Sequence, residues 1–177
     1  GIIRTYMQTQ GVRNPYDMLA SIPIDLRTSQ SQSLQMGTHF CYGDITLPTN
    51  TEGTIPRLWE IKHQMDDLKN SADPVILHTN QWLLTNMLPE CLHRWIIRCL
   101  WNKTSVLISN LPAPTTMLTV ASHKVKNIIY WQPPPDHVTL SLSFITYTDQ
   151  VYMSVIVDKA VIPEPKILTS LFIYEVN

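Results

Sequence analysis

The stretch TSVLISNLPAPTT, residues 104–116, constrains the fold of this chain more than any other. It opens with the apolar run Val106-Leu107-Ile108, which predicts a short buried strand. It then reaches Pro112 and Pro114, and each proline fixes its own φ, removes a backbone N–H donor and pushes the preceding residue towards extended geometry. We therefore expect the chain to leave its sheet abruptly here and to continue as a stiff segment that cannot pair like an ordinary strand.

The elements before this stretch predict helices packed on strands. Residues 2–9 carry apolar side chains at helical spacing and stop near Gly11. Residues 21–27 predict a strand in which Pro23 is tolerable at an edge or an end. Residues 39–47 predict another strand. Residues 54–70 predict an amphipathic helix with the apolar stripe Leu58, Ile61, Met65 and Leu68.

After the stretch, the pattern changes to hairpins and a closing helix. Residues 138–147 alternate apolar and hydroxyl side chains, which predicts a half-buried strand. A turn at residues 148–150 leads into a partner strand at 151–157, and the prolines of 162–165 start a last helix bearing Ile167, Leu168, Leu171 and Phe172.

Residues 80–101 are the most apolar helical region and are interrupted by Pro89. Arg94 and Arg98 lie on a face of their own beside Trp95 and Trp101. An interfacial helix that touches a membrane is one interpretation. A helix packed on the sheet with solvated arginines is the one we favour, because apolar stripes at helical spacing usually belong to a core.

Composition excludes several classes of protein. The 177 residues predict one domain, and 44% hydrophobic against 15% charged residues favours a folded chain. A net charge of −1 gives no electrostatic case for binding nucleic acid or an anionic membrane. Three cysteines without metal spacing favour a reducing compartment. No run reaches the roughly 18 apolar residues of a membrane-spanning helix. The N-terminus begins as though inside a helix, so we expect a piece of a longer protein.

Four groups of residues resemble the C-terminal domain of wax ester synthase/diacylglycerol acyltransferases, the WSD-type O-acyltransferases. Ser109 to Pro114, Ser-Asn-Leu-Pro-Ala-Pro, is similar to the family's Ser-Asn-Val-Pro-Gly-Pro. Residues 65–70, Met-Asp-Asp-Leu-Lys-Asn, resemble its Met-Asp-x-Leu-Lys-Asn, and residues 21–27 resemble its Val-Pro-Val-Ser-Leu-Arg strand. Residues 147–165 follow its strand, turn, strand and Pro-x-Pro order. Ala113 and Asp149 stand where the family has glycine, and at Ala113 a positive φ would cost about 1 kcal/mol.

The resemblance implies a fold and an activity. The fold would be α/β: a two-layer lobe with a mixed β-sheet, one half of a coenzyme A-dependent acyltransferase of the chloramphenicol acetyltransferase type. Residues 1–177 would be a single C-terminal lobe. The whole enzyme would transfer fatty acyl groups from acyl-coenzyme A, a co-substrate and not a bound cofactor, to a fatty alcohol or diacylglycerol. The partner would be an N-terminal lobe, with a peripheral membrane contact, and the location intracellular, at the endoplasmic reticulum or plasma membrane.

The catalytic base of the family is missing from this sequence. The family's His-His-x-x-x-Asp-Gly motif supplies a general base, and none of the six histidines here adjoins another or precedes Asp-Gly at that spacing. His39 alone invites a catalytic interpretation, although we favour a strand histidine paired to a neighbour. An independent Ser-His-Asp site stays open, because such residues are distant in sequence. We expect no catalytic residue and no metal ligand in this chain, and the lobe to be inactive alone.

The remaining role is to build a substrate tunnel with the other lobe. Our candidates for its wall are Asn110, Pro112 and Pro114, with a purely structural strand exit as the alternative. Asp158, at a strand end, could orient a contact between lobes, and helix capping is the interpretation we favour. A lipid-binding or membrane-associating module that lost the base, and a lobe of a condensation-type acyltransferase, are rival functions.

Overall fold

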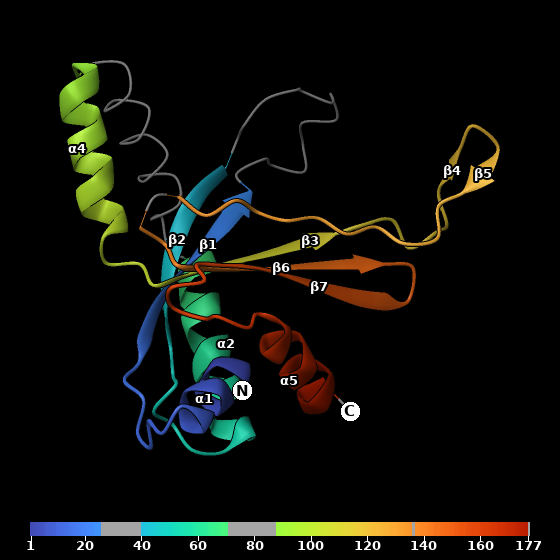
Figure 1. The fold of residues 1–177 in the computed structure, drawn as a ribbon. Helices are drawn as coiled ribbons and strands as arrows, with labels where there is room; N and C mark the ends of the chain where they lie inside the picture. The colour runs from blue at the N-terminus through green and yellow to red at the C-terminus, as the bar shows by residue number, and fades with distance from the viewer. Residues whose placement is uncertain (26–39, 71–87, 136, 177) are drawn as a thin grey trace.

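A five-stranded mixed sheet organises the chain, with helices gathered on one of its faces (Figure 1). The structure is a computed structural model that describes residues 1–25, 40–70, 88–135 and 137–176. Its strands stand in the order β2-β1-β3-β6-β7. Their bounds are β1 Met18–Asp25, β2 Phe40–Leu47, β3 Val106–Pro112, β6 Leu140–Tyr147 and β7 Gln150–Val157. The expected α/β lobe with a mixed sheet is thus confirmed.

Pairing within the sheet combines two antiparallel hairpin-like pairs with two parallel contacts. Strand β1 pairs antiparallel with β2 and β6 pairs antiparallel with β7. Strand β3 joins these pairs and runs parallel to both β1 and β6. The β1–β3 contact is short, with Ala20 opposite Val106 and Ser21 opposite Leu107. Pro23 thus lies in an inner strand and not at an edge, but beyond the short contact with β3, so it interrupts no described ladder there.

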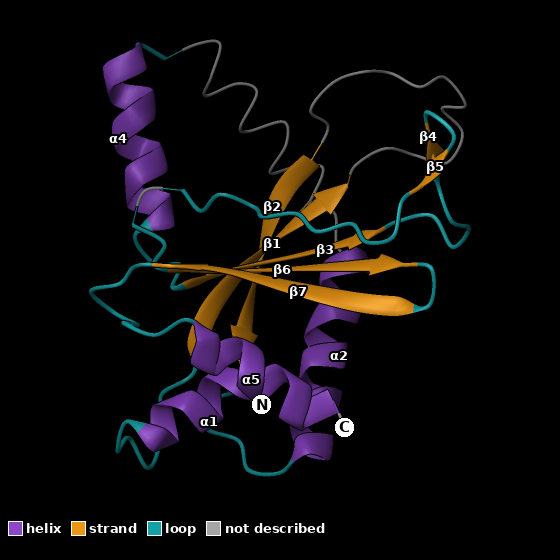
Figure 2. Cartoon of the chain, turned by 45° about the vertical axis from the view of Figure 1, so that its right-hand side comes forward, coloured by secondary structure: helices purple, strands orange, loops and turns teal. Residues whose placement is uncertain are grey.

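Helices α1 (Ile2–Thr9), α2 (Thr54–Asn70) and α5 (Lys166–Val176) lie together on one side of the sheet (Figure 2). The buried core between them and the sheet contains Ala20, Ile45, Leu47, Val106, Leu140, Leu142, Ile162 and Leu168. Helices α1 and α2 match their predicted ranges, and α5 begins after the prolines as predicted. In α2, Ile61, Met65 and Leu68 pack on the core, whereas Leu58 is 64% exposed. No described helix is long and apolar enough to cross a membrane.

Helix α4 (Glu90–Trp101) stands apart from the sheet (Figures 1 and 2), so the packing on the sheet that we favoured is wrong for it, whereas Arg94 and Arg98 are exposed as expected. It meets the sheet at its last residue, where the Trp101 ring packs edge-on against Tyr42 at 4.6 Å. The other turns extend beyond the described strands, and Leu92 and Trp95 are exposed. The period of a helix shows which residues share a face, but not whether that face finds a partner.

Some predicted features lie outside the described residues. They are Leu26 and Arg27 of the first predicted strand, His39 and the N-terminal part of the region 80–101. Within the described part of the chain, Cys41 is buried, Cys91 and Cys99 are exposed, and all three are free thiols.

Candidate functional site

Strand β3 carries the candidate residues at its carboxyl end. Its first half is buried, since Val106 and Leu107 are 0% exposed and Ser109 is 1% exposed. Asn110, Pro112 and Pro114 are exposed. Strand β3 thus passes from the buried core to the surface within residues 109–114.

The strand does not leave the sheet where its prolines predicted. Its parallel register with β6 continues to Pro112 opposite Thr146, and the Ala113 N–H still donates to the Thr146 carbonyl at 2.9 Å. Because amides alternate in direction along a strand, the missing N–H of Pro112 falls on the side facing β1. The pairing between β1 and β3 ends at Leu107, so Pro112 breaks no ladder between the described parts of these strands.

The alanine at the family's glycine position is unstrained. Positive φ angles at described non-glycine residues occur only at Ala121, Ser122, His137 and Thr148. Ala113 is not among them, so this departure from the family pattern costs no backbone strain. In the β6–β7 turn the left-handed residue is Thr148, at φ 53°, and not Asp149, which stands where the family has glycine.

Asp158 lies far from the other candidates. Its N–H donates to the Thr139 carbonyl at 2.9 Å, at the end of β6 opposite to Thr146 and Pro112. Seven residues of strand separate the two places, a length of about 23 Å. Its carboxylate accepts a hydrogen bond from the Ala160 N–H at 2.9 Å, and its carbonyl accepts from Val161 and Ile162. Asp158 therefore stabilises a turn that ends before α5, and the helix-capping interpretation is wrong.

Beyond Pro114 the chain forms a projecting arm, residues 115–131, which bears the small hairpin of β4 (Thr119–Val120) and β5 (His123–Lys124) (Figure 1). Ala121 and Ser122 both have positive φ, as a type I′ turn requires. The arm exposes its large apolar side chains, which are Met117, Leu118, Val120, Ile129 and Trp131. An exposed apolar surface of this kind suits a binding partner.

Tyr147 fastens the base of the arm to the sheet. This side chain is fully buried, and its hydroxyl accepts from the Leu118 N–H at 2.9 Å and donates to the Val125 carbonyl at 2.8 Å. The Val125 N–H in turn donates to the Leu118 carbonyl at 2.9 Å. One phenol therefore holds both ends of the hairpin, a role that no sequence pattern indicated.

The end of the arm and the residue that follows it, Gln132, lie over the sheet face opposite to the helices (Figure 2). Ser141 donates to the Gln132 carbonyl at 2.7 Å, and Ser143 accepts from the Gln132 N–H at 2.9 Å. The Tyr130 hydroxyl donates to Ser109 at 2.8 Å. Strand β6 is therefore buried on both faces, and its prediction as half-buried is wrong because Ser141 and Ser143 bind another segment instead of water.

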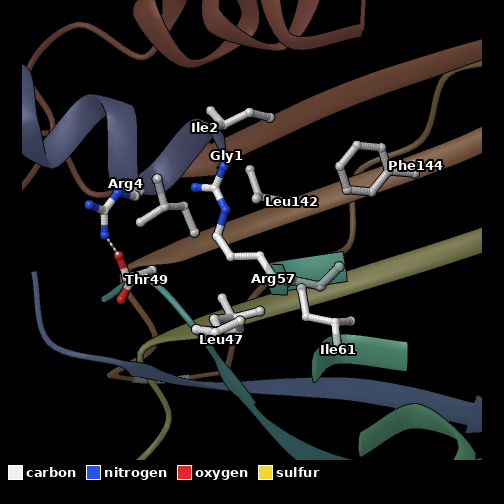
Figure 3. Close-up of a pocket in the computed structure, with 12 residues that line it drawn as sticks. Gly1, Ile2, Arg4, Leu47, Thr49, Arg57, Ile61, Leu142 and Phe144 are labelled. Carbon is white, nitrogen blue, oxygen red and sulfur yellow. Dashed lines mark hydrogen bonds between the residues drawn. The ribbon is translucent and has the colours of Figure 1, made fainter. Parts of the chain in front are cut away.

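An apolar cavity of about 170 Å³ lies on the helix face (Figure 3). Most of its lining is aliphatic or aromatic: Ile2, Ile3, Leu47, Pro48, Ile61, Ile108, Leu142 and Phe144. Small-molecule sites usually measure about 300–1,000 Å³. The cavity is thus too small for a whole thioester substrate and suits a few methylene groups.

Two arginines line the cavity. Arg4 is buried and donates to the carbonyls of Thr49 at 2.6 Å and Asn50 at 2.8 Å (Figure 3). Arg57 lies beside Gly1 (Figure 3), and its Nε donates to the Gly53 carbonyl at 3.0 Å. The lining contains no carboxylate, imidazole or thiol. The cavity can therefore bind an apolar group but offers no general base or nucleophile.

Polar side chains elsewhere in the described part of the chain bond to one another. Buried Ser21 donates to Asp44 and contacts the Thr104 hydroxyl at 3.2 Å, which links β1, β2 and the approach to β3. His63 is bound to Asp67 on the solvent side of α2, with Nδ1 2.7 Å from the carboxylate. Among the described residues, no three histidine, cysteine or acidic side chains gather as a metal site would require.

Comparison with known proteins agrees with this architecture. The sequence model of the WS/DGAT C-terminal domain matches residues 36–176. The fold is similar to that of a wax ester synthase/diacylglycerol acyltransferase from Marinobacter aquaeolei VT8, with a TM-score of 0.63 and 18% sequence identity. That similarity covers 96% of this chain and 37% of the Marinobacter chain, so this chain spans little more than a third of its length. No curated protein matches the sequence.

Proposed function

This chain belongs to the WS/DGAT C-terminal domain family, and from that membership we propose that it is the C-terminal lobe of an O-acyltransferase making wax esters or triacylglycerol. The acyl donor is acyl-coenzyme A and the acceptor is a fatty alcohol or diacylglycerol. In this proposal a histidine of an N-terminal lobe removes the proton from the acceptor hydroxyl. The hydroxyl oxygen then attacks the thioester carbonyl, and coenzyme A leaves as the thiolate.

One observation supports the proposal: the residues that resemble the family's motif keep their strand pairing and are exposed at their carboxyl end. Residues 109–112 hold their register with β6, Ala113 is unstrained, and yet Asn110, Pro112 and Pro114 face solvent. The apolar arm follows directly. A second lobe seated there would exclude water from the thioester, which protects it from hydrolysis.

Binding of the acyl chain is the contribution that this lobe can make. Each methylene group moved from water onto an apolar wall contributes about 0.8 kcal/mol. The small cavity, which holds no acid or base, is consistent with binding without chemistry. Asp158, about 23 Å along the sheet from Pro112 by strand length, is left out of this wall.

The proposal is tested by assaying ester formation from palmitoyl-coenzyme A and hexadecanol. We expect none from the 177-residue chain alone, and activity when the chain is expressed with the polypeptide encoded upstream of Gly1. In that longer protein Asn110→Ala should lower kcat/KM about tenfold through misplaced substrate. It should change the free energy of unfolding by less than about 0.5 kcal/mol, because Asn110 is exposed.

Asn102→Ala is the matched control, since Asn102 is also exposed and ends α4. Equal activity of the two variants would refute a role for Asn110 in the wall. Ester formed by the 177-residue chain alone would refute the missing-lobe proposal.

A non-catalytic lipid-binding module is the rival, and the apolar cavity without a base favours it. The two are separated by the sequence upstream of Gly1. A His-His-x-x-x-Asp-Gly motif with ester formation supports the enzyme. Lipid binding without that motif, and without ester, supports the module.

A further inference from the structure

Strand β7 forms one edge of the described sheet (Figure 1). On its inner side it keeps an unbroken antiparallel register with β6, which begins where Tyr147 lies opposite Gln150. Asp158 continues the same ladder beyond the strand, since its N–H donates to the Thr139 carbonyl at 2.9 Å. Antiparallel partners exchange hydrogen bonds at every second residue, so Gln150, Tyr152, Ser154 and Ile156 are the residues of β7 that bond to β6.

The residues between them direct their backbone groups to the outer side of β7. These residues are Val151, Met153, Val155 and Val157. No further strand of the described part of the chain lies on that side. A row of outward N–H and C=O groups is a template for another β-strand, because a strand presents donors and acceptors at the same spacing.

Strand β7 lacks the features by which edge strands are usually protected. Its sequence, Gln-Val-Tyr-Met-Ser-Val-Ile-Val, contains no charge and no proline, and its register with β6 contains no bulge. The other edge strand, β2, contains Asp44, and its Thr46 N–H already donates to the side chain of Gln64 in α2 at 2.7 Å. Of the two edges of the described sheet, β7 is therefore the one suited to pairing.

We propose that two copies of this chain pair through β7, antiparallel about a two-fold axis. Only the register centred on Ser154 pairs all four outward residues with one another, because it sets Met153 opposite Val155 and Val151 opposite Val157. The same surface patch then serves on both copies, as a two-fold contact requires. The two sheets become one continuous sheet across the contact.

Charge at the two ends of β7 agrees with this register. Asp149 precedes the strand and Lys159 follows it, and both side chains are exposed. Within one copy, about 26 Å of strand separates them. Neither makes an ion pair with another described residue. The register centred on Ser154 sets Asp149 of one copy opposite Lys159 of the other, and it does so twice by symmetry. This reciprocity of charge favours a second copy as the occupant.

A second lobe is the competing occupant, and another surface is available to it. The motif of residues 109–114 and the arm lie at the end of the sheet where β3 ends (Figure 1). The outer side of β7 instead runs along the length of a strand. Pairing through β7 requires no acyl transfer, so the dimer and the activity of the longer protein can each fail without the other.

Analytical ultracentrifugation of the 177-residue chain tests the pairing. One strand edge is smaller than a standard interface of about 1,600 Å², so we expect a weak dimer that forms as the concentration rises to about 200 μM. Val155→Pro should weaken dimerisation about tenfold, because it removes an outward N–H and leaves the ladder to β6 in place. Val120→Gln with Trp131→Gln changes the exposed arm and should leave the dimer unchanged.

Charge reversal tests the register. Asp149→Lys alone and Lys159→Asp alone should each weaken dimerisation about fivefold, since each sets like charges opposite one another at both ends of the contact. An equimolar mixture of the two variants should recover the affinity of the parent chain, because every opposed pair then has opposite signs. Asp66→Lys reverses an exposed charge on α2 and is the matched control, which should change nothing.

Hydrogen exchange measures the edge directly. In dilute samples the amides of Val151, Met153, Val155 and Val157 should exchange faster than those of the residues between them, which bond to β6. A rise in concentration should slow these four amides and leave the others unchanged. Circular dichroism shows whether Val155→Pro is folded, and the charge variants carry the test independently of it.

Three outcomes would overturn the inference. They are a chain that stays monomeric over this range, a mixture of charge variants no tighter than either variant alone, or four outward amides whose exchange ignores concentration. Association that is lost in Val120→Gln with Trp131→Gln would assign the contact to the arm. Outward amides that are protected in a monomeric longer protein would assign β7 to the second lobe.

Discussion

At the scale of single residues, the backbone angle of Thr148 reveals local strain that the sequence alone did not indicate. The two-residue β6–β7 turn, between Tyr147 and Gln150, needs a left-handed residue, and Thr148 occupies that position at φ 53°. Threonine is β-branched, so this conformation costs about 1–3 kcal/mol. The family's glycine aligns with Asp149, so the resemblance did not indicate that Thr148 is the left-handed residue.

Thr148→Gly should therefore stabilise the chain by about 0.5–1 kcal/mol, since glycine reaches positive φ without steric cost. The measurement is the denaturant midpoint with the slope unchanged. Thr146→Gly is the control, because Thr146 lies within β6 at an ordinary strand angle and should lose about 1 kcal/mol. A loss of stability in Thr148→Gly would show that the turn tolerates threonine without strain.

The protonation of His63 is a second feature at this scale. A backbone hydrogen bond at His63 first, and the Asp67 carboxylate second, raise the pKa of this imidazole above 6.5. A raised pKa in the folded state means that protonated His63 stabilises α2 fully below pH about 6.5, and that the contribution is lost as pH rises through the folded pKa. The side chain is solvent-exposed, so the effect is small.

NMR titration of the His63 ring in the 177-residue chain checks the direction of this shift. Asp67→Asn should bring the pKa down towards its ordinary value, because it removes the carboxylate 2.7 Å from Nδ1. A pKa at or below 6.5 in the parent chain contradicts the assignment.

At the scale of elements, the projecting arm depends on side chains of the sheet more than on its own short hairpin. A β4–β5 ladder of two residues in each strand is too short to be stable by itself. The hydroxyls of Tyr147, Ser141 and Ser143 hold its base and its returning segment. Removing one of these hydroxyls should therefore loosen the part of the arm that it holds.

Tyr147→Phe should cost about 1–2 kcal/mol, because the Leu118 N–H and the Val125 carbonyl lose their shared partner. Hydrogen exchange at the Leu118 amide should accelerate, while exchange in β3 should not change. Tyr152→Phe is the control, since its hydroxyl bonds only side chains, those of Asn127 at 3.0 Å and Gln150 at 2.6 Å, on the surface. Equal acceleration at Leu118 in both variants would argue against the fastening role.

At the scale of the whole molecule, exposed apolar side chains gather at the end of the sheet where β3 ends. The motif of residues 109–114 and the arm both lie there, and the arm exposes five large apolar side chains. Patches of this kind are uncommon on proteins that act alone. The proposed second lobe explains why they persist.

A hydrophobic dye such as anilinonaphthalene sulfonate should bind the 177-residue chain. Val120→Gln with Trp131→Gln should reduce that fluorescence, because both side chains are more than half exposed on the arm. Tyr16→Gln, which changes a 90% exposed aromatic residue elsewhere, should not. A chain that stays monomeric and binds no dye would contradict the need for a partner.

Local pattern in the sequence determined most elements and the family. Helical spacing predicted α1, α2 and α5 within a residue or two, and strand alternation predicted β6 and β7. These patterns are readable because neighbours along the chain set φ, turn chemistry and the face on which a side chain lies. The resemblance at residues 65–70 and 109–114 led to the family that the comparison then showed.

Tertiary structure alone decided what each face touches. The sequence could not show that Pro112 keeps its place beside β6 because the pairing of β3 with β1 stops at Leu107, or that Ser141 and Ser143 bind a returning segment. Nor could it show that Trp101 of α4 packs on Tyr42 while Leu92 and Trp95 stay exposed. Such contacts join residues far apart in the chain, and their geometry follows from how whole elements pack, which no local period encodes.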